Sequence, residues 1–257
     1  MATPMSAAQF AKCLRDEGLT VIEVGDWETH NRNHMGPWGP VYGVMMHHTV
    51  TKGTAATVRI CQHGYAGLPG PLCHGVIAKD GKVHLVGYGR ANHAGSGDDD
   101  VLRAVIAEKA LPADNETSTD GNRHFYGFEC ENLGDGKDPW PAVQVAAMEK
   151  AAAAVCRVHK WGAPSVIRHL DWQPGKIDPR GVDWPKMQAA IGVRLKTKPK
   201  PPAPATYKVK DGDSLWGIAA AKLGDGSRYM EIAALNRAEV PNPSELRIGL
   251  VLTLPKK

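Results

Sequence analysis

The stretch VYGVMMHHT, residues 41–49, is a short apolar run that ends in polar side chains. Such a run predicts a buried strand. Two more strands are expected over HFYGFECEN (124–132) and SVIRHL (165–170), and GVIAKDGKVHLV (75–86) predicts a hairpin that turns at Asp80-Gly81. Helical spacing lies between these runs, over residues 100–111, 142–162 and 183–192. Alternating strands and helices predict an α/β fold in which helices cover a central sheet.

The clearest domain boundary is RLKTKPKPPAPAT, residues 194–206. Its four prolines remove backbone donors and favour polyproline II, so it predicts a semi-rigid linker between a first domain, residues 1–193, and a second, residues 207–257. The second domain has an expected order of strand, helix, helix and strand. Those elements are predicted over 207–210, 213–224, 228–236 and 250–255.

Charge is unevenly placed along the 257 residues, whose net charge is +4. Residues 1–193 carry 19 basic and 21 acidic side chains, so the excess of positive charge lies in the linker and the second domain. Nucleic-acid binding normally needs a basic face on a folded domain, and is not expected here. A basic tail suits an anionic surface such as a bacterial wall.

Five cysteines occur without a CxxC pair, so a cysteine-rich zinc site is not expected. Cys61 and Cys73 could form a disulfide, but reduced thiols are favoured because nothing marks the chain as secreted. The N-terminal segment MATPMSAAQFAKCLRDEG lacks the charged start and apolar centre of a typical signal peptide. No apolar run approaches the roughly 20 residues of a spanning helix, so membrane insertion is not expected.

Three segments hold residue types that could bind a metal: MMHHT, YGFECEN and RHLDWQPGKIDP. Catalytic zinc takes three protein ligands and leaves a position for water, and no HExxH helix supplies them here. His47 and His48 are adjacent on a strand and point to opposite faces, so only one can face a given cleft, and periodicity does not choose between them. The Pro-Gly turn lets His169 and Asp178 approach one ion.

Together these segments resemble the zinc-dependent N-acetylmuramoyl-L-alanine amidases (type 2 amidases), relatives of the peptidoglycan recognition proteins, from about Tyr42 to Asp183. The resemblance implies a mixed central sheet flanked by helices and one Zn²⁺ ion. The implied ligands are His47, His169 and Asp178. Some relatives use a cysteine as third ligand, but no cysteine follows His169 here.

The same resemblance assigns catalytic roles to Glu129 in GFECEN and to Lys176, two residues before the third ligand. Glu129 would move a proton from water to the leaving amine, and Lys176 would stabilise the oxyanion. Cys130, between two glutamates, is expected to face the core.

Four further residues are expected to contact substrate: His74, His93, Asn132 and Trp172. His93 lies in ANHAG, which is similar to the family's Trp-His-Ala-Gly stretch. The chain departs from the family pattern at Asn92, where a tryptophan is common, and in a spacing from His169 to Asp178 one residue shorter than in some members.

Residues 207–255 resemble a LysM module, through YKVKDGDSLWGIA, IAALN and LRIGLVLTLP. The resemblance implies a small βααβ domain that binds glycans containing N-acetylglucosamine, such as peptidoglycan. The glycan-binding residues it implies are Gly212, Asp213, Ser214, Leu215 and Asn236.

The resulting hypothesis is a monomeric peptidoglycan hydrolase that cleaves the bond between N-acetylmuramic acid and L-alanine. It would be made in the host cytoplasm without a signal peptide and act on the bacterial wall after release, as a bacteriophage endolysin does. The alternatives are a peptidoglycan-binding protein without catalysis, a cytosolic amidase that recycles soluble muropeptides, and a zinc endopeptidase that cuts within the stem peptide.

Overall fold

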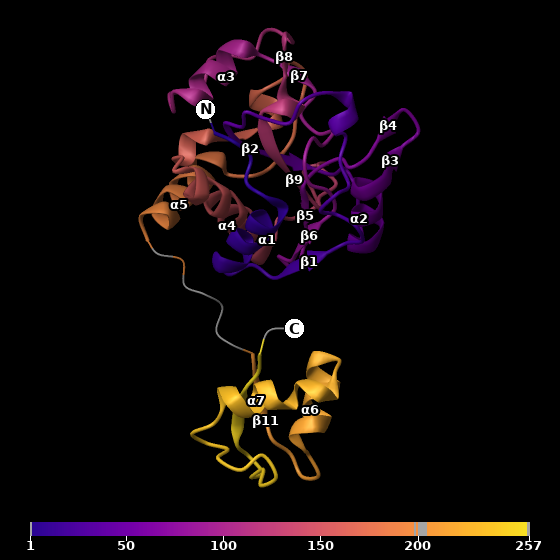
Figure 1. Ribbon diagram of the computed structural model, residues 1–257. Helices are drawn as coiled ribbons and strands as arrows, with labels where there is room; N and C mark the ends of the chain where they lie inside the picture. Colours follow the sequence, from indigo (N-terminus) through magenta and orange to yellow (C-terminus); the bar gives the residue numbers. More distant parts are fainter. Residues whose placement is uncertain (1, 198, 200–204, 256–257) are drawn as a thin grey trace. The chain divides into compact units, whose positions relative to one another are not determined.

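The computed structural model describes residues 2–197, 199 and 205–255, and the chain divides into two compact units, residues 1–201 and 202–257 (Figure 1). The first unit contains a six-stranded sheet in the order β1-β6-β5-β9-β2-β10. All neighbouring strands are parallel except β5 and β6, so the predicted mixed sheet is confirmed. The strands of this sheet are β1 Val21–Glu23, β2 Gly43–His48, β5 Gly75–Ile77, β6 Val83–Leu85, β9 Phe125–Cys130 and β10 Val166–Arg168.

The interior strand β2 is buried along its whole length and pairs with β9 on one side and with the edge strand β10 on the other. Its near-continuous apolar run is typical of a parallel strand covered on both faces. The register pairs His47 with Glu129, and it pairs Arg168, the last residue of β10, with Met46. The polar ends of all three strands therefore lie at the same edge of the sheet.

Helices cover both faces of this sheet. Val44 and Met46 pack with α1, α4 and α5 on one face, whereas Met45 packs with α3 on the other. Helix α2 also lies on the second face, where Cys61 packs against Cys73 and Val76. The helices are α1 Ala7–Asp16, α2 Thr54–His63, α3 Asp99–Ile106, α4 Ala142–His159 and α5 Trp184–Lys196.

The smaller pieces of the first unit are short strands and 3-10 helices. The two-stranded sheets are β3 Gly64–Tyr65 with β4 Leu68–Pro69 and β7 Ser96–Gly97 with β8 Thr119–Asp120. The 3-10 helices are η1 Asn33–Met35, η2 Gly121–Arg123, η3 Ala163–Ser165 and η4 His169–Asp171.

Most elements expected from the sequence are present. The hairpin of β5 and β6 turns at Gly81, whose φ of +79° suits glycine. Helix α5 runs through Lys196, so residues 194–196 are helical instead of belonging to the predicted linker. The polyproline II conformation expected for residues 199–204 falls mainly outside the described residues. The hydrophobic patterns in the sequence did not predict α1, α2 or β1.

The second unit has the expected βααβ order. Strands β11 Thr206–Lys208 and β12 Val251–Thr253 pair in antiparallel fashion, and between them lie α6 Leu215–Leu223, η5 Gly226–Arg228 and α7 Tyr229–Leu235. Its own apolar core includes Ile218, Ile232 and Leu252.

The structure has all five cysteines as free thiols. Among the described residues, no helix combines the length and apolar character needed to cross a membrane.

Candidate metal centre and its cavity

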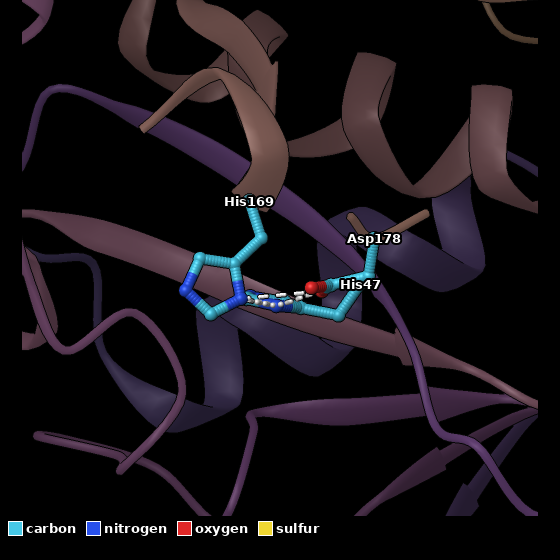
Figure 2. Close-up of side chains that lie close together, drawn as sticks. All are labelled: His47, His169 and Asp178. Carbon is cyan, nitrogen blue, oxygen red and sulfur yellow. Dashed lines mark hydrogen bonds and ion pairs between the residues drawn. The ribbon is translucent and has the colours of Figure 1, made fainter. Parts of the chain in front are cut away.

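His47, His169 and Asp178 bring three donor atoms together at the edge of the sheet (Figure 2). The Nδ1 atoms of the two histidines lie 3.0 Å apart. The Oδ2 atom of Asp178 lies 3.1 Å from His47 Nδ1 and 3.2 Å from His169 Nδ1. We call these three atoms the donor triad. The structure thus brings together the three predicted ligands.

Backbone geometry places each member of the triad. His47 ends the buried strand β2, and His169 begins η4 directly after β10, the neighbour of β2. The chain then turns at Gly175, where φ is +83°, and returns so that the Asp178 carbonyl accepts a hydrogen bond from Leu170 N at 2.9 Å. The Pro-Gly turn therefore brings Asp178 back beside η4, as the sequence suggested.

The sheet also decides between the two adjacent histidines. His47 lies on the same face as Met45, which packs with α3, whereas His48 shares the face of Val44 and Met46. His48 Nδ1 accepts a hydrogen bond from Arg180 N at 3.0 Å. His48 therefore helps to hold the segment that follows Asp178, and His47 is the metal candidate.

The triad fits a zinc ion. Ligand bonds of about 2.0–2.1 Å in a tetrahedral arrangement require nitrogen and oxygen donors a little over 3 Å apart, and the three separations agree with this. Two imidazole nitrogens and a carboxylate are also a donor set that zinc commonly takes. A second group of acidic residues, around Asp98, is not a comparable metal site. The Asp98 carboxylate already accepts hydrogen bonds from four backbone N–H groups and caps α3.

Electrostatics favour the protonation states that a metal requires. Burial lowers the pKa of His47 to about 4, so its imidazole is neutral near pH 7. Burial by itself raises the pKa of Asp178, but the contacts with the His169 and His47 imidazoles outweigh it and hold that pKa below its usual value. A neutral imidazole and an ionised carboxylate bind a cation without first losing a proton.

Glu129 lies on the same sheet face as His47, because the two residues are register partners on parallel strands. Its Oε2 atom is buried and finds no hydrogen-bond partner among the described residues. Burial raises its pKa well above the usual glutamate value, and the nearby Cys61 and Asp178 add to the rise. A half-buried carboxyl with one unpartnered oxygen and a raised pKa is typical of a group that exchanges protons. Cys130, the next residue, faces the core as expected.

A cavity of about 460 Å³ opens onto this centre, and the buried His47 lies behind its wall. Glu129, His169, Asp178, the exposed Lys176 and His93 all line it. Its outer part is apolar, formed by exposed side chains that we call the apolar rim. The rim consists of Val50, Tyr65, Leu68 and Ile177, which are between 45% and 66% exposed.

No pattern in the sequence predicted that these four residues would lie together at the cavity. Tyr65 and Leu68 come from the small β3–β4 hairpin, whose ends are tightly packed. A Cβ at Gly64 or Gly70 would lie 2.1 Å from backbone oxygens, so both positions require glycine. Val50 has φ of +52°, an uncommon conformation for a β-branched residue. The rim is therefore held by its backbone at the mouth of the cavity.

Three predicted substrate contacts do not fit the structure. Trp172 is fully buried against Phe125, and its Nε1–H donates to Ala94 O at 2.9 Å. His74 is also fully buried, and both of its ring nitrogens are hydrogen-bonded to backbone atoms. Asn132 is buried and its amide holds the loop that follows β9. None of these three side chains lines the cavity. Their hydrogen bonds to the backbone support the fold around the site instead.

The second unit gives a similar correction. Leu215 belongs to its apolar core, and buried Asn236 bonds both the N–H and the C=O of Thr253 in β12. Asp213 accepts hydrogen bonds from Lys210 N and the Tyr207 hydroxyl, so it too has a structural part. Of the five predicted glycan contacts, Gly212 and Ser214 are the exposed ones, and Ser214 also caps α6.

Comparison with known proteins agrees with this geometry. Residues 37–181 match the family model of N-acetylmuramoyl-L-alanine amidase, Amidase_2, and residues 207–255 match the LysM domain. The first match covers more than half of the chain. The protein therefore belongs to the N-acetylmuramoyl-L-alanine amidase family and carries a LysM domain, which confirms the resemblance seen in the sequence.

Individual relatives can also be named. N-acetylmuramoyl-L-alanine amidase XlyB of Bacillus subtilis (strain 168) is 27% identical over 175 residues, which are 64% of this chain and 53% of the relative. The chain thus spans about half the length of that curated relative. Among solved structures, amidase LysC from Clostridium intestinale URNW has 16% identity and a TM-score of 0.45, covering 66% of this chain and 95% of LysC. A mutant endolysin from Bacillus subtilis has 20% identity and a TM-score of 0.46, covering 68% and 99%.

Proposed function

We propose that this protein hydrolyses the amide bond between N-acetylmuramic acid and L-alanine in peptidoglycan. The observation that carries the proposal is that the donor triad lies beside Glu129, whose buried Oε2 atom has no hydrogen-bond partner among the described residues, where His169, Asp178 and Glu129 line one cavity. Membership of the amidase family supports the choice of bond. The LysM domain supports peptidoglycan as the substrate, because it would tether the enzyme to glycan strands and raise its local concentration.

One zinc ion would be held by His47, His169 and Asp178. When bound, it would supply a Lewis acid that lowers the pKa of a coordinated water towards about 7. Glu129 is placed to accept a proton from water in the cavity and to return it to the departing amine of L-alanine. Burial raises the pKa of Glu129 above the usual glutamate value, which makes its carboxylate a stronger proton acceptor than an ordinary one.

Lys176 would stabilise the negative charge that develops on the carbonyl oxygen of the scissile amide. Its side chain is exposed and lines the cavity, and its positive charge lowers the pKa of Glu129. The backbone N–H of Lys176 donates to Gln173 O at 3.1 Å, so the turn holds the backbone from which the side chain reaches the cavity. A cation beside the reacting carbonyl would contribute electrostatic stabilisation of the oxyanion-hole kind.

The apolar rim suits the part of the substrate that carries methyl groups, namely the lactyl group and the first residues of the stem peptide. An endolysin role, expected from the pairing of two wall-directed domains, belongs to the same proposal. Its test is lysis of bacteria that express the protein in their cytoplasm, which should follow permeabilisation of the inner membrane and should not occur before it.

Mass spectrometry of peptidoglycan digested by the zinc-loaded protein tests the proposed reaction. A new N-terminal L-alanine is expected, together with glycan strands free of peptide. New termini within the stem peptide would indicate an endopeptidase, and binding without new termini would indicate a non-catalytic binding protein. Cleavage of soluble muropeptides but not of intact walls would favour a recycling amidase.

A further inference from the structure

His93 was expected to contact substrate, but its ring is occupied by other contacts. The side chain is 7% exposed and lies beside His47, with His93 Nδ1 3.0 Å from His47 Nε2. Its other ring nitrogen, Nε2, lies 3.1 Å from the carbonyl oxygen of Phe125. Both nitrogens of His93 are therefore used inside the protein, although the ring lines the cavity.

The carbonyl group of Phe125 decides which ring nitrogens of His93 and His47 carry a hydrogen. A carbonyl oxygen can only accept, so His93 Nε2 must carry the hydrogen. A neutral His93 then has a free lone pair on Nδ1, which accepts a hydrogen bond from His47 Nε2–H. Once Nε2 of His47 carries its hydrogen, its Nδ1 has a lone pair, and that atom belongs to the donor triad.

The position of His93 is fixed from several sides. Its backbone N–H and that of Ala94 both donate to Asn122 Oδ1 at 2.8 Å. Gly127 lies against the imidazole, where an added Cβ would be 2.5 Å from His93 Nδ1. Only glycine fits at that point of β9, which explains why a strand otherwise rich in large side chains has a glycine there.

The other histidine of the triad is held less firmly. Its outer nitrogen, His169 Nε2, lies 3.3 Å from Oε1 of Gln173, a half-buried side chain that also lines the cavity. The two imidazoles thus differ in their outer hydrogen-bond partner. That of His47 is the buried His93 ring, and that of His169 is the half-buried Gln173 side chain.

We infer that His93 is a positioning residue that fixes His47 in the Nε2–H tautomer and so presents Nδ1 of His47 to the metal. Hydrogen bonds of this kind orient metal-binding histidines and strengthen their ligation. The inference rests on the proposed metal centre and is separate from the identity of the bond that is cleaved.

Zinc affinity of the full-length protein, measured by competition with a chromophoric chelator, tests this role without relying on activity. His93→Phe keeps a ring but removes the acceptor, and is expected to weaken zinc binding by about 10- to 100-fold. His93→Asn places an amide oxygen near the position of Nδ1 and is expected to restore most of that loss. The matched control is His159→Phe, which changes a half-buried histidine on α4, on the opposite face of the sheet, and should leave zinc affinity unchanged.

Folded His93→Phe protein with wild-type zinc affinity would overturn the inference, and so would a failure of His93→Asn to improve on His93→Phe. If His93→Phe does not fold, long-range ¹H–¹⁵N spectra of the metal-free wild type decide the question. They should show the Nε2–H tautomer for both His47 and His93, and an Nδ1–H tautomer at His47 would overturn the inference. A wild-type protein that binds no zinc would instead contradict the proposed function.

Discussion

His47 and Glu129 are register partners on the adjacent parallel strands β2 and β9. Their side chains leave the same face of the sheet, so one backbone ladder positions both the proposed metal ligand and the proposed proton carrier. Both strands are interior strands of the sheet and almost wholly buried, so packing on both faces holds this relationship. A reaction that needs a metal and a base at a fixed separation is well served by such a framework.

Substitution of Asp178 by Asn should abolish metal binding. The change keeps the size of the side chain but removes the negative charge from the donor triad, so zinc content should fall from about one ion per chain to near zero. Elemental analysis after dialysis measures this, and the exposed His63→Ala variant serves as a control that should keep its zinc. A full complement of zinc in Asp178→Asn protein would show that the metal lies elsewhere.

Glu129→Gln should separate catalysis from stability. Removal of a general acid–base group lowers kcat by about 10²- to 10⁴-fold. Zinc content should not change, and the melting temperature should stay equal or rise, because burial penalises the ionised Glu129 carboxylate. Steady-state kinetics and calorimetry at pH 7 provide these measurements.

Glu131→Gln, two residues along, is the matched control for that experiment. Glu131 accepts hydrogen bonds from Gly53 N and the Thr54 hydroxyl at the start of α2, so its loss should lower stability more than kcat. The account of Glu129 would fail if Glu129→Gln retained wild-type turnover or lost its metal.

The apolar rim should affect substrate binding more than turnover. Tyr65→Ala or Leu68→Ala removes exposed apolar surface at the mouth of the cavity, and each should raise KM by about fivefold, or about 1 kcal/mol, with kcat little changed. Val193→Ala removes a similarly exposed side chain on α5, outside the cavity, and should have no effect. Unchanged KM in both rim variants would mean that the substrate does not touch the hairpin.

His74 should make the fold sensitive to acid. Its neutral ring donates from Nε2 to Gly89 O and accepts at Nδ1 from Gly127 N, and burial lowers its pKa to about 4. A lowered histidine pKa contributes stability that is complete above the unfolded-state value of about 6.5 and is lost as pH falls towards the folded-state value. The free energy of unfolding should therefore fall by roughly 3 kcal/mol from this group between those pH values.

Urea unfolding of metal-free protein at pH 7 and pH 4 measures this loss. His47, whose pKa is also lowered, contributes with the same sign, so the wild type must be compared with His74→Gln. The variant should be less stable at pH 7 and should show a shallower pH dependence. Parallel curves for the two proteins would contradict the assignment to His74.

Local patterns in the sequence predicted much of the sheet but not which face each residue occupies. The apolar run before His47, the turn at Gly81 and the Pro-Gly turn before Asp178 each depend on neighbouring residues, and the structure contains all three. The choice between His47 and His48 depends on which helices cover each face, which is a property of the whole fold. Periodicity along one strand does not include that information.

The wrong prediction for Trp172 and the failure to predict α2 and β1 both arise because local sequence carries little information about these features. Trp172 lies three residues from His169 in the sequence, yet its indole packs against Gly97. A Cβ at that glycine would lie 2.2 Å from the indole ring. Its direction follows from packing at long range and not from its distance to a ligand in sequence. Helix α2 has Gly53 at its N-cap and therefore no side-chain cap, and β1 has three residues, so both give weak local signals.

Hydrolysis of a soluble N-acetylmuramoyl peptide in H₂¹⁸O by the zinc-loaded protein is the most direct test of the central claim. The proposed reaction adds one ¹⁸O atom to the lactyl carboxylate of N-acetylmuramic acid and releases a peptide with an unlabelled, free N-terminal L-alanine. Mass spectrometry should find that labelling with the wild type, and at least a hundredfold less product with Glu129→Gln. Label on an amino-acid carboxylate within the stem peptide, or no cleavage by zinc-loaded wild type, would contradict the account.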